Sequence, residues 1–138
     1  MLAALATASA DDVLDALPDG LDAHVTERGR SFSGGQRQRL VLARVLALDP
    51  EVLVLVEPTS AVDAHTEAAV AARLRDHRRG RTTVVTTSSP LLLDAVDEVA
   101  YLRDGRVVAS GRHRDLLASV PEYRLTVTRE DLEEVAPR

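Results

Sequence analysis

Residues 33–63 constrain the fold of this 138-residue chain more than any other segment. Ser33 is a favoured N-cap residue, and the apolar spacing after it predicts a helix over residues 34–48. The continuous apolar run Val52–Val56 predicts a strand that is buried on both faces, as strands of parallel sheets are. A second helix is predicted over residues 64–79. Helix, strand and helix in this order indicate an α/β fold.

The sequence after this segment predicts more strands and a hairpin. Thr82–Thr87 is β-branched throughout, which favours a second strand. Asp104-Gly105 predicts a tight turn between strands at residues 99–103 and 106–109. Short helices are predicted at residues 11–17, 91–96 and 114–119. The expected fold is therefore a mostly parallel sheet with helices and a C-terminal β-hairpin.

Composition excludes several classes of function. The net charge of −5 argues against a nucleic-acid partner. Cysteine is absent, which excludes disulfides and thiol nucleophiles, and all 17 basic residues are arginine, which excludes any mechanism that needs a lysine. Residues 1–10 end in Ala-Ser-Ala like a signal peptide, but they have no basic leader, so a cytosolic chain is expected. We expect no metal site, and surface positions for the histidines His24, His65, His77 and His113.

The first segment that carries chemistry is Ser33-Gly34-Gly35-Gln36. Two glycines at a helix start let the backbone approach a ligand closely. The exposed N–H groups and the positive end of the helix dipole then favour an anion, while Ser33 adds a hydroxyl and Gln36 an amide. These four residues are candidate phosphate-binding residues. The alternative is an ordinary N-cap followed by a flexible turn.

The second such segment is the end of the apolar strand, where Glu57 follows Val56. Ligands of α/β folds bind at the carboxyl ends of parallel strands. A carboxylate at this place can orient and deprotonate a water molecule, so Glu57 is a candidate catalytic residue. The alternative is an ordinary acidic residue of a loop.

Taken together, the two segments resemble the ABC ATPase family. Phe32-Ser-Gly-Gly-Gln-Arg-Gln-Arg-Leu40 looks like its signature motif, with Phe32 in place of the usual Leu, and Val52–Asp63 looks like Walker B followed by the D-loop. Val25–Gly29 is similar to the segment that exporters place before the signature. The hairpin around Asp104-Gly105 and the helix after it are similar to the end of that domain.

The resemblance covers about Asp11 to Tyr123 and implies a partial P-loop NTPase domain whose phosphate-loop strand is absent. We expect residues 1–123 to form the C-terminal portion of the nucleotide-binding domain and residues 124–138 a charged, mobile tail. The family's phosphate loop needs Gly-x-x-x-x-Gly-Lys-Ser/Thr, and the chain has neither that pattern nor any lysine.

Two positions depart from the family at the site that the domain builds for itself. The Asp that holds magnesium is replaced by Val56, and the switch histidine by Ser88, which we keep as a nucleotide-binding candidate together with Asp63 of the D-loop. The resemblance implies that ATP and Mg²⁺ bind in an assembled dimer. It implies the degenerate half of a heterodimeric exporter, with Ser33–Gln36 completing the partner's ATP site.

The implied partners are a second nucleotide-binding domain and the transmembrane domain of an exporter, with this domain in the cytoplasm at the inner face of the membrane. The chain alone is expected not to hydrolyse ATP, and its folding alone is doubtful because a missing strand leaves open sheet edges. Two alternatives stay open. One is a non-catalytic fragment that docks on another nucleotide-binding domain, and the other is a soluble ABC ATPase of the DNA or ribosome type.

Overall fold

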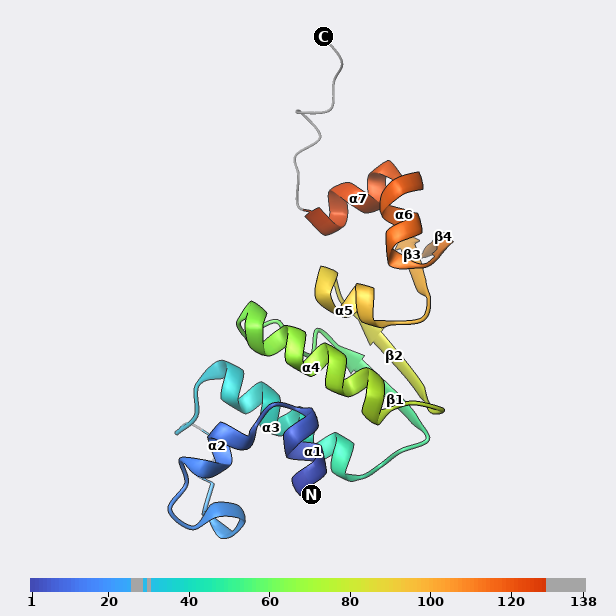
Figure 1. Cartoon of the computed structure of the whole chain (residues 1–138). Helices are drawn as coiled ribbons and strands as arrows, with labels where there is room; N and C mark the ends of the chain where they lie inside the picture. Colours follow the sequence, from blue (N-terminus) through green and yellow to red (C-terminus); the bar gives the residue numbers. More distant parts are fainter. Residues whose placement is uncertain (26–28, 30, 129–138) are drawn as a thin grey trace. The chain divides into compact units, whose positions relative to one another are not determined.

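A computed structural model describes residues 1–25, 29 and 31–128, and the chain divides into two compact units, Met1–Thr86 and Thr87–Arg138. The first unit holds helices and a parallel strand pair (Figure 1). Its elements are α1 (Leu2–Thr7), α2 (Asp11–Asp15), the 3-10 helix η1 (Gly20–Asp22), α3 (Gly34–Ala47), β1 (Val52–Val56), α4 (Ala64–His77) and β2 (Thr82–Thr86). The second unit has a hairpin and three helices: α5 (Pro90–Ala95), β3 (Val99–Arg103), β4 (Arg106–Gly111), α6 (His113–Ser119) and α7 (Pro121–Thr128).

The parallel pair β1–β2 confirms the predicted sheet of the first unit, in the register Val52↔Thr82 to Val56↔Thr86. Within the residues that the structure describes, β2 pairs with β1 alone. The prediction that β1 is buried on both faces is wrong. Leu53 and Leu55 are buried, while Val52, Val54 and Val56 are 62%, 63% and 74% exposed. The reason is that the buried side of β1 faces the helices of this unit, and its valine side has no such layer within the described part of the unit.

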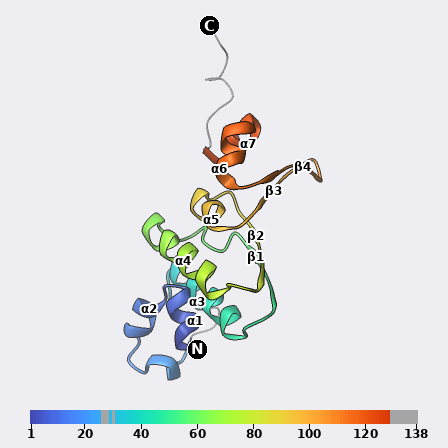
Figure 2. The ribbon, with the colours of Figure 1, turned by 45° about the vertical axis from the view of Figure 1, so that its right-hand side comes forward.

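The core of the first unit includes a helix for which the sequence analysis assigned no element. The segment Met1–Ala10 forms α1 and the turn after it, and its small residues let α1 lie close against α3 and α4 (Figure 2). Burial of this apolar surface is the main force that holds the unit together. The buried residues of this core are Ala4, Leu5, Ala8, Ala10, Val13, Leu42, Ala43, Leu46, Leu53, Leu55, Val70 and Leu74.

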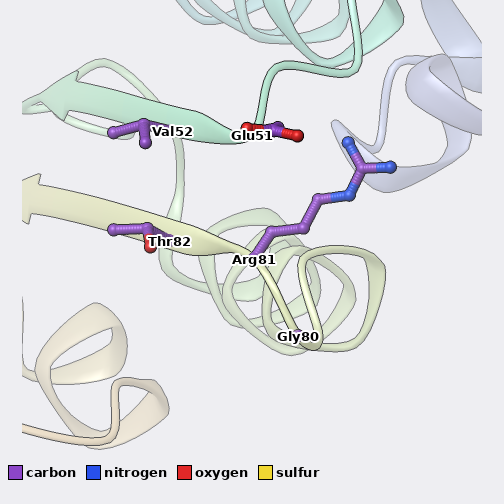
Figure 3. Close-up of a pocket in the computed structure, with 5 residues that line it drawn as sticks. All are labelled: Glu51, Val52, Gly80, Arg81 and Thr82. Atoms are coloured by element: carbon purple, nitrogen blue, oxygen red, sulfur yellow. The ribbon is translucent and has the colours of Figure 1, made fainter.

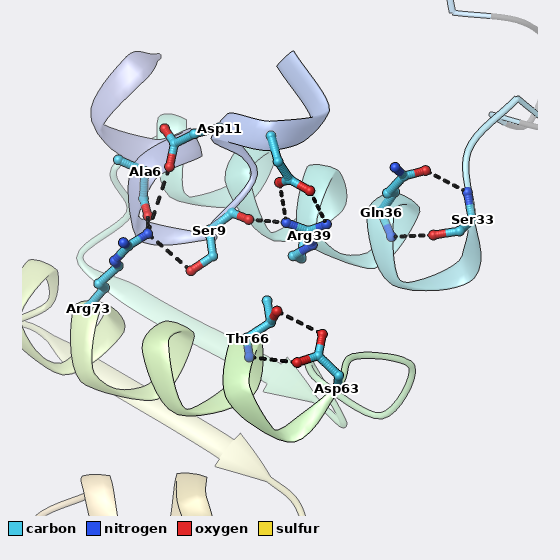
Figure 4. Close-up of polar contacts among 10 residues, drawn as sticks. Ala6, Ser9, Asp11, Ser33, Gln36, Arg39, Asp63, Thr66 and Arg73 are labelled. Carbon is cyan, nitrogen blue, oxygen red and sulfur yellow. Dashed lines mark hydrogen bonds and ion pairs between the residues drawn. The ribbon is translucent and has the colours of Figure 1, made fainter. Parts of the chain in front are cut away.

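Two arginines hold the turn between α1 and α2 (Figure 4). Arg39 of α3 donates to the Ser9 carbonyl and forms a bidentate ion pair with Asp12, whose pKa is lowered by this hydrogen bond. Arg73 of α4 donates to the Ala6 carbonyl at 2.7 Å and to Ser9 Oγ at 3.1 Å. The guanidinium groups satisfy carbonyls at a turn in which Ser9 has a φ of 51°. The N-terminal helices are thus tied to both long helices of the unit.

At the amino ends of β1 and β2 the guanidinium of Arg78 is buried, with 4% of the residue exposed. It donates to the carbonyls of Pro50, Glu51 and Thr82 and to Thr83 Oγ1. A shallow hollow opens at the same edge, lined by Glu51, Val52, Gly80, Arg81 and Thr82 (Figure 3). This edge is opposite to the end of β1 where Glu57 lies, so the hollow is separate from the candidate site.

In the second unit the predicted hairpin is confirmed. Asp104 and Gly105 form its turn with φ angles of 50° and 73°, as a type I′ turn requires. The expected surface position of His113 is wrong, because this residue is 7% exposed and its Nδ1 lies 2.7 Å from the Tyr123 hydroxyl. Tyr123 also contacts the ring of Tyr101 edge to face, and its burial raises its pKa. The histidine is held in the core of this unit because its ring is paired there.

Residues 124–128, assigned from the sequence to the charged tail, belong to helix α7, while residues 129–138 lie outside the described residues. The same holds for residues 26–28 of the segment that resembles the exporter motif before the signature. None of the helices in the described ranges is long and apolar enough to cross a membrane.

Candidate functional site

Helix α3 begins after Ser33, the predicted N-cap, and Ser33 forms a complete capping box with Gln36. Ser33 Oγ accepts from the Gln36 backbone N–H at 3.2 Å, and Gln36 Oε1 accepts from the Ser33 N–H at 2.9 Å (Figure 4). This reciprocal pair satisfies two of the backbone donors at the helix start. Because both side-chain oxygens act as acceptors here, the Ser33 hydroxyl proton and the Gln36 amide N–H groups are left as donors.

The two glycines of the helix start lie in different surroundings. Gly34 is exposed, and a Cβ built on it would meet only Ala61 Cβ, at an ordinary contact distance of 3.7 Å. A Cβ built on Gly35 would lie 2.7 Å from the Ala61 carbonyl oxygen, which is closer than real Cβ contacts. Gly35 is thus needed for packing inside this chain, and Gly34 is the glycine whose position is open to a ligand. Glycine N–H groups and the helix dipole at this start suit a phosphate group.

Gln38, one turn into α3, is a site residue that the sequence analysis missed. Its Nε2 donates to the Glu57 carbonyl at 2.9 Å and to Ser60 Oγ at 3.1 Å, and its Oε1 accepts from the Ala61 N–H at 2.9 Å. Its spacing from Gly35 is the signal that was available, because residues three apart share a helix face. The same face therefore carries the glycine that approaches the loop and the amide that binds it.

Glu57 directly follows β1, as predicted, and extends its pairing by one residue. Its N–H donates to the Thr86 carbonyl at 2.9 Å, and its φ is 44°. A non-glycine residue in this left-handed region is strained, and such strain is common in functional loops. Glu57 is exposed, so a carboxylate there is accessible to water. The arrangement suits a general base at a strand end.

Asp63 ends the loop after β1 and caps α4. Its carboxylate accepts from the Thr66 N–H at 3.0 Å and from Thr66 Oγ1 at 2.8 Å. These hydrogen bonds, led by the backbone one, lower the pKa of Asp63, because they stabilise its charged form. The same loop is also bonded to α4 through the buried Thr59, whose hydroxyl donates to Glu67 Oε1. Asp63 therefore has a defined structural role beside any role toward nucleotide.

Val56, at the position of the family's magnesium-binding Asp, does not fit a magnesium site, and Ser88 lies apart from it along the chain. Val56 offers no oxygen ligand, and its side chain points to the exposed face of β1. Ser88 is half-buried and belongs to the second unit. Across the described residues, no three His, Cys, Asp or Glu side chains gather as metal ligands. The structure thus brings together Ser33–Gln36, Glu57 and the loop to Asp63, while Ser88 is placed with the other unit.

The helix start at Gly34-Gly35, packed against the loop after a parallel strand, makes this chain an α/β domain with a candidate phosphate site. The family model described as ABC transporter matches residues 5–60. Relatives and a solved structure cover most of the chain at 32–42% identity. The chain belongs to the ABC transporter ATPase family, and it is similar to exporters.

Three comparisons illustrate this similarity. The chain is 39% identical to a probable multidrug resistance ABC transporter ATP-binding/permease protein of Bacillus subtilis, over 94% of the chain and 22% of that protein. It is 42% identical to an ATP-dependent lipid A-core flippase of Ralstonia nicotianae, over 83% of the chain and 19% of that protein. A bacterial Atm1-family ABC exporter with ATP bound superposes with a TM-score of 0.81 at 32% identity, covering 98% of the chain and 23% of that structure.

The chain thus spans about a fifth of the length of these relatives. The family to which it belongs generally uses ATP and Mg²⁺. What the fold supplies toward such a ligand is the start of α3, the loop after β1 and the strained Glu57.

Proposed function

We propose that this chain is an ATP-binding module of an ABC-type exporter, and that Ser33–Gln36 complete the ATP site of a partner nucleotide-binding domain. The observation that carries the proposal is the start of α3. Its capping box leaves the Ser33 hydroxyl proton and the Gln36 amide N–H groups as donors beside the exposed Gly34, at the positive end of a 14-residue helix. The chain has no lysine and no phosphate loop. Its donors therefore serve a phosphate that another domain holds.

The chain's own ATP site is, on this proposal, the degenerate one of a heterodimer. Val56 cannot bind Mg²⁺ through an oxygen, and Ser88 cannot act as the switch histidine does. Glu57 keeps its place at the strand end, but both the magnesium-binding Asp and the switch histidine that would act with it are replaced. In the assembled heterodimer this site hydrolyses ATP only weakly, and the partner's site carries the turnover. The chain by itself is inactive.

The module works on the cytoplasmic side of a membrane, attached to the transmembrane domain of the exporter. This part of the proposal rests on the relatives, whose printed names describe transporters and flippases. Residues 1–123 act as the portion of the nucleotide-binding domain that carries the signature helix, Walker B, the D-loop and the switch region. Residues 124–138 follow it as a tail, of which 124–128 are helical.

A substitution pair at Gly34 tests the trans-acting signature. Gly34 is exposed, it has room for a side chain, and it is the first residue of α3, where a carboxylate is favourable to the helix dipole. Gly34→Asp therefore preserves the fold and places a negative charge where the phosphate is expected. Gly34→Asn has the same shape without the charge.

The measurement is ATPase activity of the assembled exporter that contains this module and its partner domain. Two like charges about 4 Å apart repel by about 1 to 4 kcal/mol between bulk water and a protein surface. We therefore expect Gly34→Asp to turn over about fivefold to a thousandfold more slowly than Gly34→Asn. Equal activity of the two variants, at any level, contradicts the proposal, because no anion then approaches the start of α3.

A second test addresses the asymmetry of the two sites. We expect Glu57→Gln in this chain to lower the turnover of the assembled exporter much less than the equivalent change in the partner domain. The amide keeps the shape of the carboxylate and removes its basicity. A loss as large as that in the partner would show that this site hydrolyses ATP at a full rate. The trans-acting signature would be unaffected by that outcome.

A further inference from the structure

The side chain of Gln38 joins two segments that are far apart in the sequence. One is the start of α3, and the other is the loop from Glu57 to Asp63. The amide is used at both ends: its Nε2 donates to the Glu57 carbonyl and to Ser60 Oγ, and its Oε1 accepts from the Ala61 N–H. Few other side chains offer two donor bonds and an acceptor in one plane.

The contact of Gly35 with Ala61 adds a second link between the same segments. The Ala61 carbonyl lies so close to Gly35 that no side chain fits between them. The backbone of Ala61 is thus held on both sides: its N–H donates to Gln38, and its carbonyl oxygen packs against Gly35 of α3. Farther along, Asp63 is held by Thr66 of α4. The loop has little freedom to move relative to the helix while these links are intact.

Gln38 is not needed for the helix itself. It lies one turn beyond the capping box, and its backbone follows α3 whatever side chain it carries. Alanine and methionine are good helix formers, so replacing it preserves the helix. What is lost is the hydrogen bonding of the Gln38 amide to the Glu57 carbonyl and to the Ala61 N–H, while the Glu57 carbonyl keeps a longer bond of 3.4 Å from the Ser60 N–H. Because Glu57 is strained at a φ of 44°, its conformation depends on such contacts with the residues around it.

We propose that Gln38 is a positioning residue that holds the loop from Glu57 to Asp63 in register with Ser33–Gln36, so that both segments meet the partner's ATP site as one rigid surface. This inference rests on the proposed function. Nucleotide affinity comes mainly from the partner's phosphate loop, so loss of the register lowers the rate of hydrolysis and leaves nucleotide binding intact. Misplacement of reacting groups by about 1 Å can cost about a hundredfold in rate.

The experiment measures kcat and KM for ATP in the assembled exporter with Gln38→Ala, Gln38→Met and Gln38→Glu in this module. Met keeps the length and loses all three bonds, while Glu keeps an acceptor for the Ala61 N–H and loses both donors. We expect kcat to fall about tenfold to a hundredfold for Ala and Met, with KM within about twofold. Gln38→Glu retains protection of the Ala61 amide against hydrogen exchange, and Gln38→Met loses it.

Arg44→Ala is the matched control, since Arg44 is exposed farther along the same helix, and it leaves kcat unchanged. Ser60→Ala removes one of the three bonds and gives a smaller fall in kcat. Its effect does not add to that of Gln38→Met, because both changes break the same contact. Ser60→Ala also keeps the test decisive if a Gln38 variant fails to assemble.

A wild-type kcat in Gln38→Met, or a fall that appears only as a higher KM, overturns the inference. The two proposals fail in different ways. If Gly34→Asp inactivates the exporter and the Gln38 variants do not, the trans-acting signature stands and the positioning role is wrong. If Gly34→Asp and Gly34→Asn are equal, the proposed function is wrong whatever the Gln38 variants do.

Discussion

The unequal surroundings of Gly34 and Gly35 predict opposite effects of the same substitution at neighbouring positions. Alanine at either position gains helix propensity, by up to about 1 kcal/mol, because a glycine is removed from the unfolded chain as well. At Gly34 the new methyl group meets Ala61 Cβ at an ordinary 3.7 Å. At Gly35 it lies 2.7 Å from the carbonyl oxygen of Ala61, the residue whose backbone N–H donates to Gln38.

The propensity gain is shared, so it cancels in the comparison and leaves the cost of the close contact. Overpacking of this kind costs about 1 to 3 kcal/mol. We expect Gly34→Ala to match or exceed the wild type in free energy of unfolding, and Gly35→Ala to lie about 1 to 3 kcal/mol below Gly34→Ala. With a urea m value of about 2 kcal/mol/M, the two midpoints differ by about 0.5 to 1.5 M.

The assay is urea unfolding of the 138-residue chain followed by circular dichroism, with both variants and the wild type under the same conditions. Equal midpoints for Gly34→Ala and Gly35→Ala would refute the reasoning, since the loop would then be free to move away from α3. That result would also weaken the basis for Gln38 as a positioning residue. Because a side chain at Gly35 disturbs the packing of the loop, a Gly35 variant cannot be used to test ATP binding alone.

Three further outcomes are expected from the structure. Arg78→Met lowers the free energy of unfolding by about 3 kcal/mol, because it removes the donors that a buried guanidinium offers to three backbone carbonyls, and Arg78→Lys restores only part of this loss in the same urea assay. Asp63→Ala removes the stability that the charged carboxylate contributes as the cap of α4. This loss is complete above 3.8, the pKa of Asp63 in the unfolded chain, and it shrinks as the pH falls through the lower pKa of the folded state. Unfolding midpoints of the variant and the wild type at pH 7 and pH 3 measure the difference. Tyr123→Phe leaves the buried His113 Nδ1 unpaired and costs about 1 to 3 kcal/mol by thermal unfolding, while Tyr101→Phe, whose hydroxyl is exposed, costs less.

Local sequence signals predicted most elements of the fold, because those elements depend on near neighbours. The N-cap at Ser33 and the apolar spacing after it were sufficient for the start of α3. Asp104-Gly105 was sufficient for the hairpin, since its turn needs two residues that tolerate positive φ. The placement of Glu57 at the end of a parallel strand followed from the apolar run before it.

Residues whose surroundings come from distant parts of the chain were not predicted in this way. A continuous apolar run such as Val52–Val56 is compatible with a strand covered on one face or on both faces. The exposed valines show that only one face is covered here. The apolar residues 1–10 gave no turn or cap signal, yet they form a buried helix against α3 and α4. His113 is buried because Tyr123 lies beside it in the fold.

The chain's own sequence determined where α3, β1, α4 and the hairpin begin, that its fold is α/β, and which residue types limit its chemistry. Those properties follow from backbone preferences and side-chain chemistry within a few residues. The tertiary structure alone decided that Gly34 is open while Gly35 is closed by Ala61, and that Gln38 binds the loop after β1. Such contacts join residues about 20 or more positions apart, so they exist only once packing has brought the segments together.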